Sequence, residues 1–254
     1  MINRSLFVSA AAVLLMTGAS ASVLAADSVS SAVQAAVADA ARPDADRQRD
    51  ANRKPGELIA FAGIKAGDKV SDMLPGGGYF TRLFSKVVGP KGVVYALAPA
   101  PRPDAPAGAP DPAAAVKKIA EDPAYANVKV GQITANPPEK VDVAWTSLNY
   151  HDLHNRPNAD LAAFNKQVFD MLKPGGTYIV IDHAAAKGTG KSSTSTLHRI
   201  DPDFVKSEVV AAGFKFDGES KALANPDDPG TAPNRDSNVQ GRTNQFVFKF
   251  RKPS

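Results

Sequence analysis

The sequence contains no cysteine, and this absence excludes several classes of protein. None of the 254 residues can form a disulfide, act as a thiol nucleophile, or ligate zinc or iron through sulfur. Charge of one sign is also scarce, because 30 Lys and Arg stand against 26 Asp and Glu and leave a net charge of +4. So small an excess favours solubility and does not indicate a nucleic-acid partner. Hydrophobic residues make up 43% of the chain, as in a globular protein with a buried core.

Long hydrophobic runs are missing too, except for one near the N-terminus. Arg4 precedes an apolar run at 6–16, and small residues follow at 23–26. The run is shorter than the ~20 residues that a membrane span needs, so the pattern favours a signal peptide at 1–26 over a membrane anchor. We expect cleavage after Ala25 or Ala26. The processed chain is then periplasmic or secreted, without stable membrane insertion.

The rest of the chain alternates strand-like and helix-like segments. Short apolar runs predict strands at 69–74, 93–97, 128–133, 141–146, 177–181, 214–217 and 245–250. Helical spacing predicts helices at 28–41, 57–62, 79–88, 113–121, 158–172 and 202–212. This alternation predicts one α/β domain at 55–254, with a doubly wound, mostly parallel sheet between two layers of helices. The last two strands have no helix between them and can pair antiparallel.

Two polar segments allow more than one interpretation. The helical, charged extension at 27–54 ends in a dense run of both charges at 44–54. That run is either a solvated helix face or a basic arm that reaches over a site. A second segment, 184–196, is rich in Gly, Ser, Thr and Lys, and we expect it to be mobile, as a lid or as a surface loop.

Candidate ligand-binding residues follow the first predicted strand. Asp72 stands near the end of that strand, ahead of the turn Pro75-Gly76-Gly77-Gly78 and the helix that starts at Tyr79. Ligands of open α/β sheets bind at the carboxyl ends of the strands. Glycines let backbone amides approach such a ligand, and the first turn of a helix leaves N–H groups free. A simple tight turn is the alternative, but the acid in front favours a cationic or hydroxylated ligand.

Candidate catalytic residues follow the fourth predicted strand, in Asn149-Tyr150-His151-Asp152. His151 can act as a general base near neutral pH, with Tyr150 and Asn149 positioning a substrate. The alternative is a loop that bonds to itself, with Asp152 as a cap. The spacing of His151 and His154, close to the predicted neighbours Asp182 and His183, is also compatible with a metal site. Histidines that line a pocket are the simpler interpretation, and we assign no metal ligand.

Several of these motifs carry a resemblance to a known family. Asp72, the loop with Gly76 and Gly78 and the following helix resemble motif I of class I S-adenosylmethionine-dependent methyltransferases. Leu172-Lys173-Pro174-Gly175-Gly176 before an apolar strand is similar to the approach to that family's fifth strand. The chain looks most like a group of secreted bacterial proteins described as predicted methyltransferases, on the segments DANRKP (50–55), PGGGYFTR (75–82), NYHD (149–152) and LHRID (197–201).

The resemblance, which covers about 57–251, implies a fold, a cofactor and site residues. The fold is a seven-stranded Rossmann-like methyltransferase sheet of order 3-2-1-4-5-7-6 with the last strand antiparallel. The implied cofactor is S-adenosyl-L-methionine. The small net charge and the basic arm favour a small-molecule substrate over nucleic acid. The implied cofactor-binding residues are Asp72, Pro75, Gly76, Gly77, Gly78, Tyr79 and Asn149. The implied catalytic residues are Tyr150, His151 and Asp152.

One departure from the family keeps two other functions open. The family usually has an acid at the end of strand two, where it binds the ribose hydroxyls, and this chain has Ala98 there. A non-catalytic ligand-binding protein that retains the fold is therefore the first alternative. A metal-dependent enzyme built on the His and Asp residues is the second. The sequence does not indicate an oligomeric state.

Overall fold

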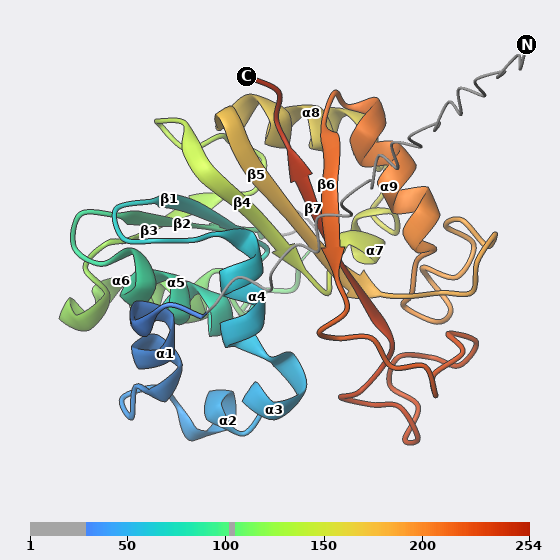
Figure 1. The fold of residues 1–254 in the computed structure, drawn as a ribbon, viewed down its shortest axis with the longest axis horizontal. Coiled ribbons are helices and arrows are strands. Elements are labelled where there is room, and N and C mark those ends of the chain that lie inside the picture. Colours follow the sequence, from blue (N-terminus) through green and yellow to red (C-terminus); the bar gives the residue numbers. More distant parts are fainter. Residues whose placement is uncertain (1–28, 102–104) are drawn as a thin grey trace, which may run out of the picture.

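The computed structural model describes residues 29–101 and 105–254, and a seven-stranded sheet runs through its centre (Figure 1). The expected signal peptide lies outside these residues. The strands are β1 (Lys69–Met73), β2 (Val93–Ala98), β3 (Val128–Gln132), β4 (Val141–Ser147), β5 (Leu172–His183), β6 (Lys215–Ser220) and β7 (Gln245–Arg251). Their spatial order is β3-β2-β1-β4-β5-β7-β6. Strands β1 to β5 pair in parallel, and β7 runs antiparallel to both neighbours. The expected order and the antiparallel last strand are confirmed.

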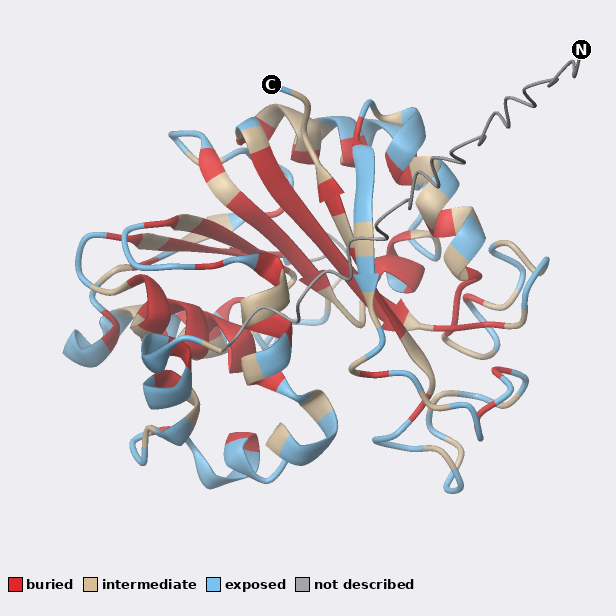
Figure 2. Cartoon of the chain, viewed as in Figure 1, coloured by how far each residue is buried: buried red, intermediate tan, exposed pale blue. Residues whose placement is uncertain are grey.

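Helices cover both faces of the sheet, as the alternation predicts. One face is covered by α4 (Pro55–Ala62), α5 (Tyr79–Val88) and α6 (Ala114–Glu121), and α1 (Ser31–Ala38) packs on α4 and α5. The other packs against α7 (Tyr150–Leu153), α8 (Leu161–Met171) and α9 (Pro202–Ala211). Figure 2 shows the central strands buried between these layers. Trp145 of β4 is fully buried against Phe80 and Phe84 of α5, so it belongs to the core, as its place in a strand predicts.

Some element boundaries differ from the predicted ones. Leu172, expected to be the last residue of a helix, and the segment 173–176, expected to stop that helix, are the beginning of β5. It joins the sheet through a bulge, because Val141 pairs with Leu172 and Val143 with Thr177. Glycine allows this irregular pairing, since Gly175 adopts a φ of +72° while its N–H donates to the Lys252 carbonyl. No helix within 29–101 and 105–254 combines the length and the apolar character that a membrane crossing requires.

The charged run forms two short helices, α2 (Asp44–Arg47) and α3 (Asp50–Arg53), between α1 and α4. Figure 1 shows them along the lower edge of the molecule, with the long loop between β6 and β7 on the other side of that edge. The remaining short element, the 3₁₀ helix η1 (Pro123–Tyr125), leads into β3. The charged run is therefore helical, and hydrogen bonds from Tyr79 and Arg82 of α5 to Asp50 and Asp46 hold it against the domain.

Candidate functional site

The loop after β1 has a backbone that only glycine accepts easily. Gly76 and Gly78 have φ values of +55° and +77°, and Leu74 has +57°. A Cβ on Gly78 would lie 2.2 Å from Cδ1 of Ile119 on α6, so Gly78 is required for close packing. Around Gly76 and Gly77, by contrast, no heavy atom lies within 4 Å of the place a Cβ would take. The loop thus presents accessible backbone on one side and packs on the other.

Asp72 lies behind this loop as a buried carboxylate. Asp72 is 3% exposed and lies on the face of β1 that α5 covers. Within the described residues, its hydrogen bonds come from Thr81, whose hydroxyl donates at 2.6 Å and whose N–H also donates. Burial raises the pKa of Asp72 to about 7, although these bonds and the charge of Arg53 act in the opposite direction. A cation placed beside Asp72 would favour the ionised form of the carboxyl group and lower this pKa.

The α2–α3 segment covers the loop and supports the interpretation as a basic arm. The guanidinium of Arg53 lies 4.3 Å from the Tyr79 ring centroid and 4.8 Å from that of Phe80. It donates to the Ser147 hydroxyl at 3.3 Å, so it reaches the carboxyl end of β4. Burial lowers the pKa of Arg53. Asp50 accepts the Tyr79 hydroxyl at 2.6 Å and so fixes the arm on α5.

Asn149 and Tyr150, both expected to face ligands, form hydrogen bonds within the fold. The Asn149 amide donates to the Leu74 carbonyl at 3.2 Å, which joins the end of β4 to the loop after β1. Tyr150 is fully buried, and its hydroxyl lies 2.8 Å from the Asn165 amide and 3.2 Å from Glu208. Burial raises the pKa of Tyr150 above its ordinary value. Both residues position α7 and the loop rather than present a free polar group.

His151 lies between two carboxylates. Its Nδ1 donates to Asp182 at 2.8 Å, and its backbone N–H donates to the same side chain at 2.7 Å. Its Nε2 lies 3.3 Å from Oδ1 of Asp152. Burial alone would lower the pKa of His151, but the two carboxylates outweigh it and raise the pKa to about 10. Both ring nitrogens of His151 therefore face a carboxylate, and its role as a general base stays a prediction.

His198 joins this cluster from the loop after β5, two residues beyond the segment 184–196 for which the sequence predicts mobility. The Arg199 side chain next to it is fully buried in an ion pair with Asp228, 2.9 Å apart, and donates to the Ala184 carbonyl. Asp201 accepts the N–H of Gly188 at 2.7 Å. The loop is therefore tied to the domain at several points. It holds Nδ1 of His198 3.4 Å from Oδ1 of Asp152.

The other two histidines lie apart from this group. His154 pairs with Glu208 at 3.1 Å, on the side of α7 that faces α9. His183 bonds to the Thr243 hydroxyl at 2.6 Å, and burial lowers its pKa to about 4. The metal alternative built from the sequence combined these two with His151 and Asp182. The structure gathers a different set, in which Asp152 and His198 take their place.

The end of β2 has the composition that the sequence indicates. Ala98 is the last residue of β2, 2% exposed, and its partner across the sheet is Gln132 at the end of β3. The described part of these two strand ends therefore has no carboxylate at the position that the family uses for the ribose.

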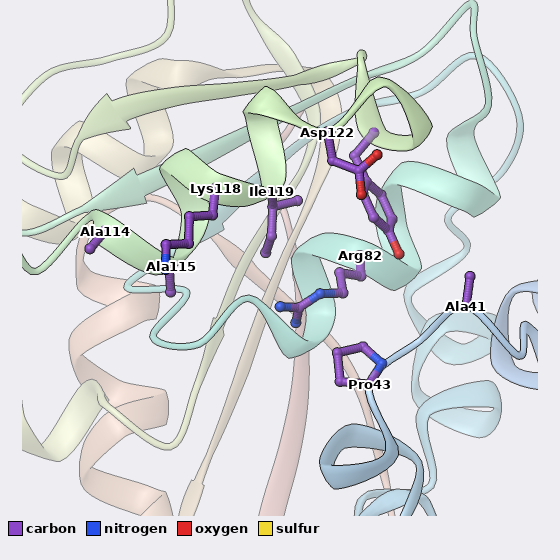
Figure 3. Close-up of a pocket in the computed structure, with 9 residues that line it drawn as sticks. Ala41, Pro43, Arg82, Ala114, Ala115, Lys118, Ile119 and Asp122 are labelled. Carbon is purple, nitrogen blue, oxygen red and sulfur yellow. The ribbon is translucent and has the colours of Figure 1, made fainter.

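A separate pocket lies behind the glycine loop. Its volume is about 500 Å³, and its lining comes from α5, α6 and the turn before α2 (Figure 3). Arg82 reaches from this pocket to the Gly77 carbonyl at 3.0 Å and to Asp46 at 2.8 Å. Arg82 therefore links the pocket to the glycine loop through hydrogen bonds. The His and Asp cluster is elsewhere, at the ends of β4 and β5.

Comparison by sequence finds no relative, whereas comparison by structure finds many. No protein-family model and no curated protein match the chain. A SAM-dependent methyltransferase from Aquifex aeolicus is similar in fold, with a TM-score of 0.52 and 18% identity over 77% of this chain and 87% of the other. An arsenic(III) S-adenosylmethionine methyltransferase from Chlamydomonas reinhardtii gives 0.54 and 17%, over 88% and 73%. The cyclase SpnF gives 0.55 and 15%, over 82% and 81%.

These similarities agree with the strand order and identify the architecture. Because the identities are low, the similarities establish the fold and not the activity. One of the similar structures is described as a cyclase and not as a methyltransferase. The chain has the seven-stranded Rossmann-like fold of the SAM-dependent methyltransferases.

Proposed function

We propose that the protein is an S-adenosylmethionine-dependent methyltransferase that acts on a small molecule. The observation that carries the proposal is Asp72, a buried carboxylate of raised pKa behind the accessible backbone of Gly76 and Gly77. A buried carboxylate gains stability from a cationic ligand, and the cofactor carries an ammonium group. Structural neighbours that are themselves SAM-dependent methyltransferases support the same assignment.

The residues around the loop fit the two ends of the cofactor's amino-acid part. Asp72 would receive the ammonium group, directly or through water. Arg53, above the loop, would receive the carboxylate, and the free N–H groups at the start of α5 would face the same ligand. The bound cofactor supplies an electrophilic methyl group on a sulfonium. The chain's own contribution is to align the two reactants and to exclude water.

The substrate would lie against α7. Asp152 is half exposed, and His151 and His198 hold its carboxylate in place. Asp152 would therefore accept a hydrogen bond from a hydroxyl or amine of the substrate. Tyr150 and Asn149 would act through packing, because their polar atoms are bonded within the fold.

Calorimetric titration with S-adenosylhomocysteine tests the proposal. We expect micromolar binding to the native protein and at least roughly tenfold weaker binding to Asp72→Asn, since one charge-assisted hydrogen bond contributes about 1.5–3 kcal/mol. Asp111→Asn is the matched control, because Asp111 lies in the proline-rich region before α6, and this variant should bind as the native protein does. Absence of binding at millimolar ligand, with the protein folded, would overturn the proposal.

A non-catalytic binding protein is the second candidate, and Ala98 is the observation that favours it. Without an acid at the end of β2, the ribose hydroxyls lose their usual acceptor. Transfer of a radiolabelled methyl group distinguishes the two functions. A protein that binds S-adenosylhomocysteine but labels no compound of a small-molecule extract fits the binding function.

We also propose that the protein is exported, on the basis of the predicted signal peptide at 1–26. N-terminal sequencing of the protein from cell fractions is the test. The expected result is a chain that begins after Ala25 or Ala26, in the periplasmic fraction or the medium. A full-length chain in the cytosolic fraction would contradict it.

A further inference from the structure

We propose that His151, Asp152 and His198 bind one divalent transition-metal ion. Nε2 of His151, a carboxylate oxygen of Asp152 and Nδ1 of His198 all lie within 4.8 Å of one another. These residues belong to two segments far apart in the chain, one after β4 and one after β5. Two imidazoles and one carboxylate form a donor set that suits zinc, iron(II) or manganese.

The distances from the Asp152 carboxylate to the two histidine nitrogens agree with a shared ion. Two ligand atoms that each lie about 2.1 Å from a metal are about 3.0–3.4 Å apart. Oδ1 of Asp152 lies 3.3 Å from the His151 nitrogen and 3.4 Å from the His198 nitrogen. An ion can therefore enter with small side-chain movements, and it would displace the proton on Nε2 of His151 to solvent.

The surroundings of His151 are those of a metal ligand. Its Nδ1 donates to Asp182, a fully buried carboxylate, and this bond fixes the ring and leaves Nε2 directed at Asp152. A carboxylate that accepts from the far nitrogen of a ligating histidine is a regular feature of metal sites, because it fixes the tautomer. Asp182 also accepts the backbone N–H groups of His151 and His183, so it is itself held firmly.

His198 is held in place by its backbone. It has a φ of +51°, a conformation that costs a non-glycine residue roughly 1–2 kcal/mol. The buried Arg199 pair with Asp228 anchors the next residue and maintains this conformation. Strain of this kind is concentrated at functional sites. Here it directs the ring of His198 towards Asp152.

The site has room for a substrate. Three protein ligands leave coordination positions open, and the half-exposed side chains of Asp152 and His198 place these positions towards solvent. The ligand class that fits is a small molecule with an oxygen donor, such as a hydroxyl or carboxylate. Metal binding by this cluster stands independently of methyl transfer. If both hold, the ion would orient the acceptor oxygen and lower its pKa.

Titration of the untagged, EDTA-treated protein with Zn²⁺ and with Co²⁺ tests the site without any cofactor. We expect one ion per chain and, with Co²⁺, visible absorption that is typical of nitrogen and oxygen ligands. His198→Ala should weaken binding at least roughly tenfold. His154→Ala is the matched control, because His154 bonds to Glu208, outside the cluster, and it should leave the affinity unchanged.

Two results would overturn the proposal. One is less than ~0.1 ion bound per chain at a metal excess that saturates typical protein sites. The other is equal affinity of the native protein and the His198→Ala variant, which would identify an adventitious ion only. If circular dichroism shows that His198→Ala is unfolded, His198→Gln and Asp152→Asn give the same comparison at the two more exposed ligands. Binding of S-adenosylhomocysteine is measured separately, so failure of one proposal does not imply failure of the other.

Discussion

Two buried carboxylates at the ends of parallel strands have opposite surroundings. Asp182, at the end of β5, accepts three N–H groups from His151 and His183. Asp72, near the end of β1, is bonded to Thr81 and has a raised pKa. The hydrogen bonds of Asp182 stabilise the fold. The burial of Asp72 destabilises the fold when its carboxyl group is ionised. A group kept in this state marks a ligand site more specifically than a well-bonded one does.

The same substitution at both positions tests this comparison most strongly, and the larger effect is expected at β5. Asp182→Asn places an NH₂ group against backbone and imidazole donors. It should lower the free energy of unfolding by about 3–5 kcal/mol, as the loss of a buried charge partner does. Urea denaturation measures the difference. A loss below about 1 kcal/mol would show that the network around His151 contributes little.

At β1 the expected sign is the reverse. Because the pKa of Asp72 is about 7 in the folded protein and near 3.8 otherwise, the folded state binds more protons between these values. Stability contributed by protonated Asp72 is therefore lost as the pH rises from about 4 to about 7. The Asp72→Asn variant has no carboxyl group to ionise, so its free energy of unfolding at pH 8 should exceed that of the native protein by up to about 4 kcal/mol. Urea denaturation at pH 5 and pH 8 checks it, and equal stability of the two proteins at pH 8 would contradict it.

The glycine loop allows a comparison of packing with ligand access. Gly78→Ala should destabilise the protein by about 1–2 kcal/mol, because of its left-handed φ and the contact with Ile119. Gly77→Ala should change stability little, since space is open there, but should weaken S-adenosylhomocysteine binding. Thermal melting and calorimetry on both variants separate the effects. If Gly77→Ala binds normally, the ligand does not approach this side of the loop.

The smallest expected effect concerns Arg53, in the α2–α3 segment that lies over the glycine loop. Arg53→Gln should weaken S-adenosylhomocysteine binding about tenfold, equivalent to about 1.4 kcal/mol, by removal of the proposed partner of its carboxylate. Arg235→Gln, at an exposed position on the β6–β7 loop, is the control and should bind normally. Calorimetric titration compares them. Tighter binding by Arg53→Gln would show instead that the arginine occupies the ligand's place.

The sequence predicted the fold well because buried strands appear as local apolar runs. The seven strands agree with the expected ones, and their order agrees with the order that the family resemblance implies. Boundaries failed where tertiary contacts decide: the segment 172–176 enters β5 because the Gly175 backbone pairs with Lys252. A helix stop and a bulged strand entry have the same Pro and Gly composition, so the sequence alone could not distinguish them.

The sequence placed the candidate residues at the strand ends, but it did not indicate their hydrogen-bond partners. Strand ends directed attention to Asp72 and to 149–152, and the structure places both there. The burial of Tyr150 depends on Asn165 and Glu208, and the doubly bonded state of His151 depends on Asp182. These partners are distant in the chain. The position of His198 likewise depends on the Arg199–Asp228 pair, for which the sequence has no local signal.

Thermal melting of the native protein and of Asp72→Asn at pH 8, each with and without saturating S-adenosylhomocysteine, tests the central claim most directly. The account predicts that the variant melts higher without ligand and that ligand raises the melting temperature of the native protein by a larger amount, because only the native carboxylate gains a cationic partner. Equal ligand-induced shifts in the two proteins, or no shift in either, would contradict the assignment of Asp72 to the cofactor.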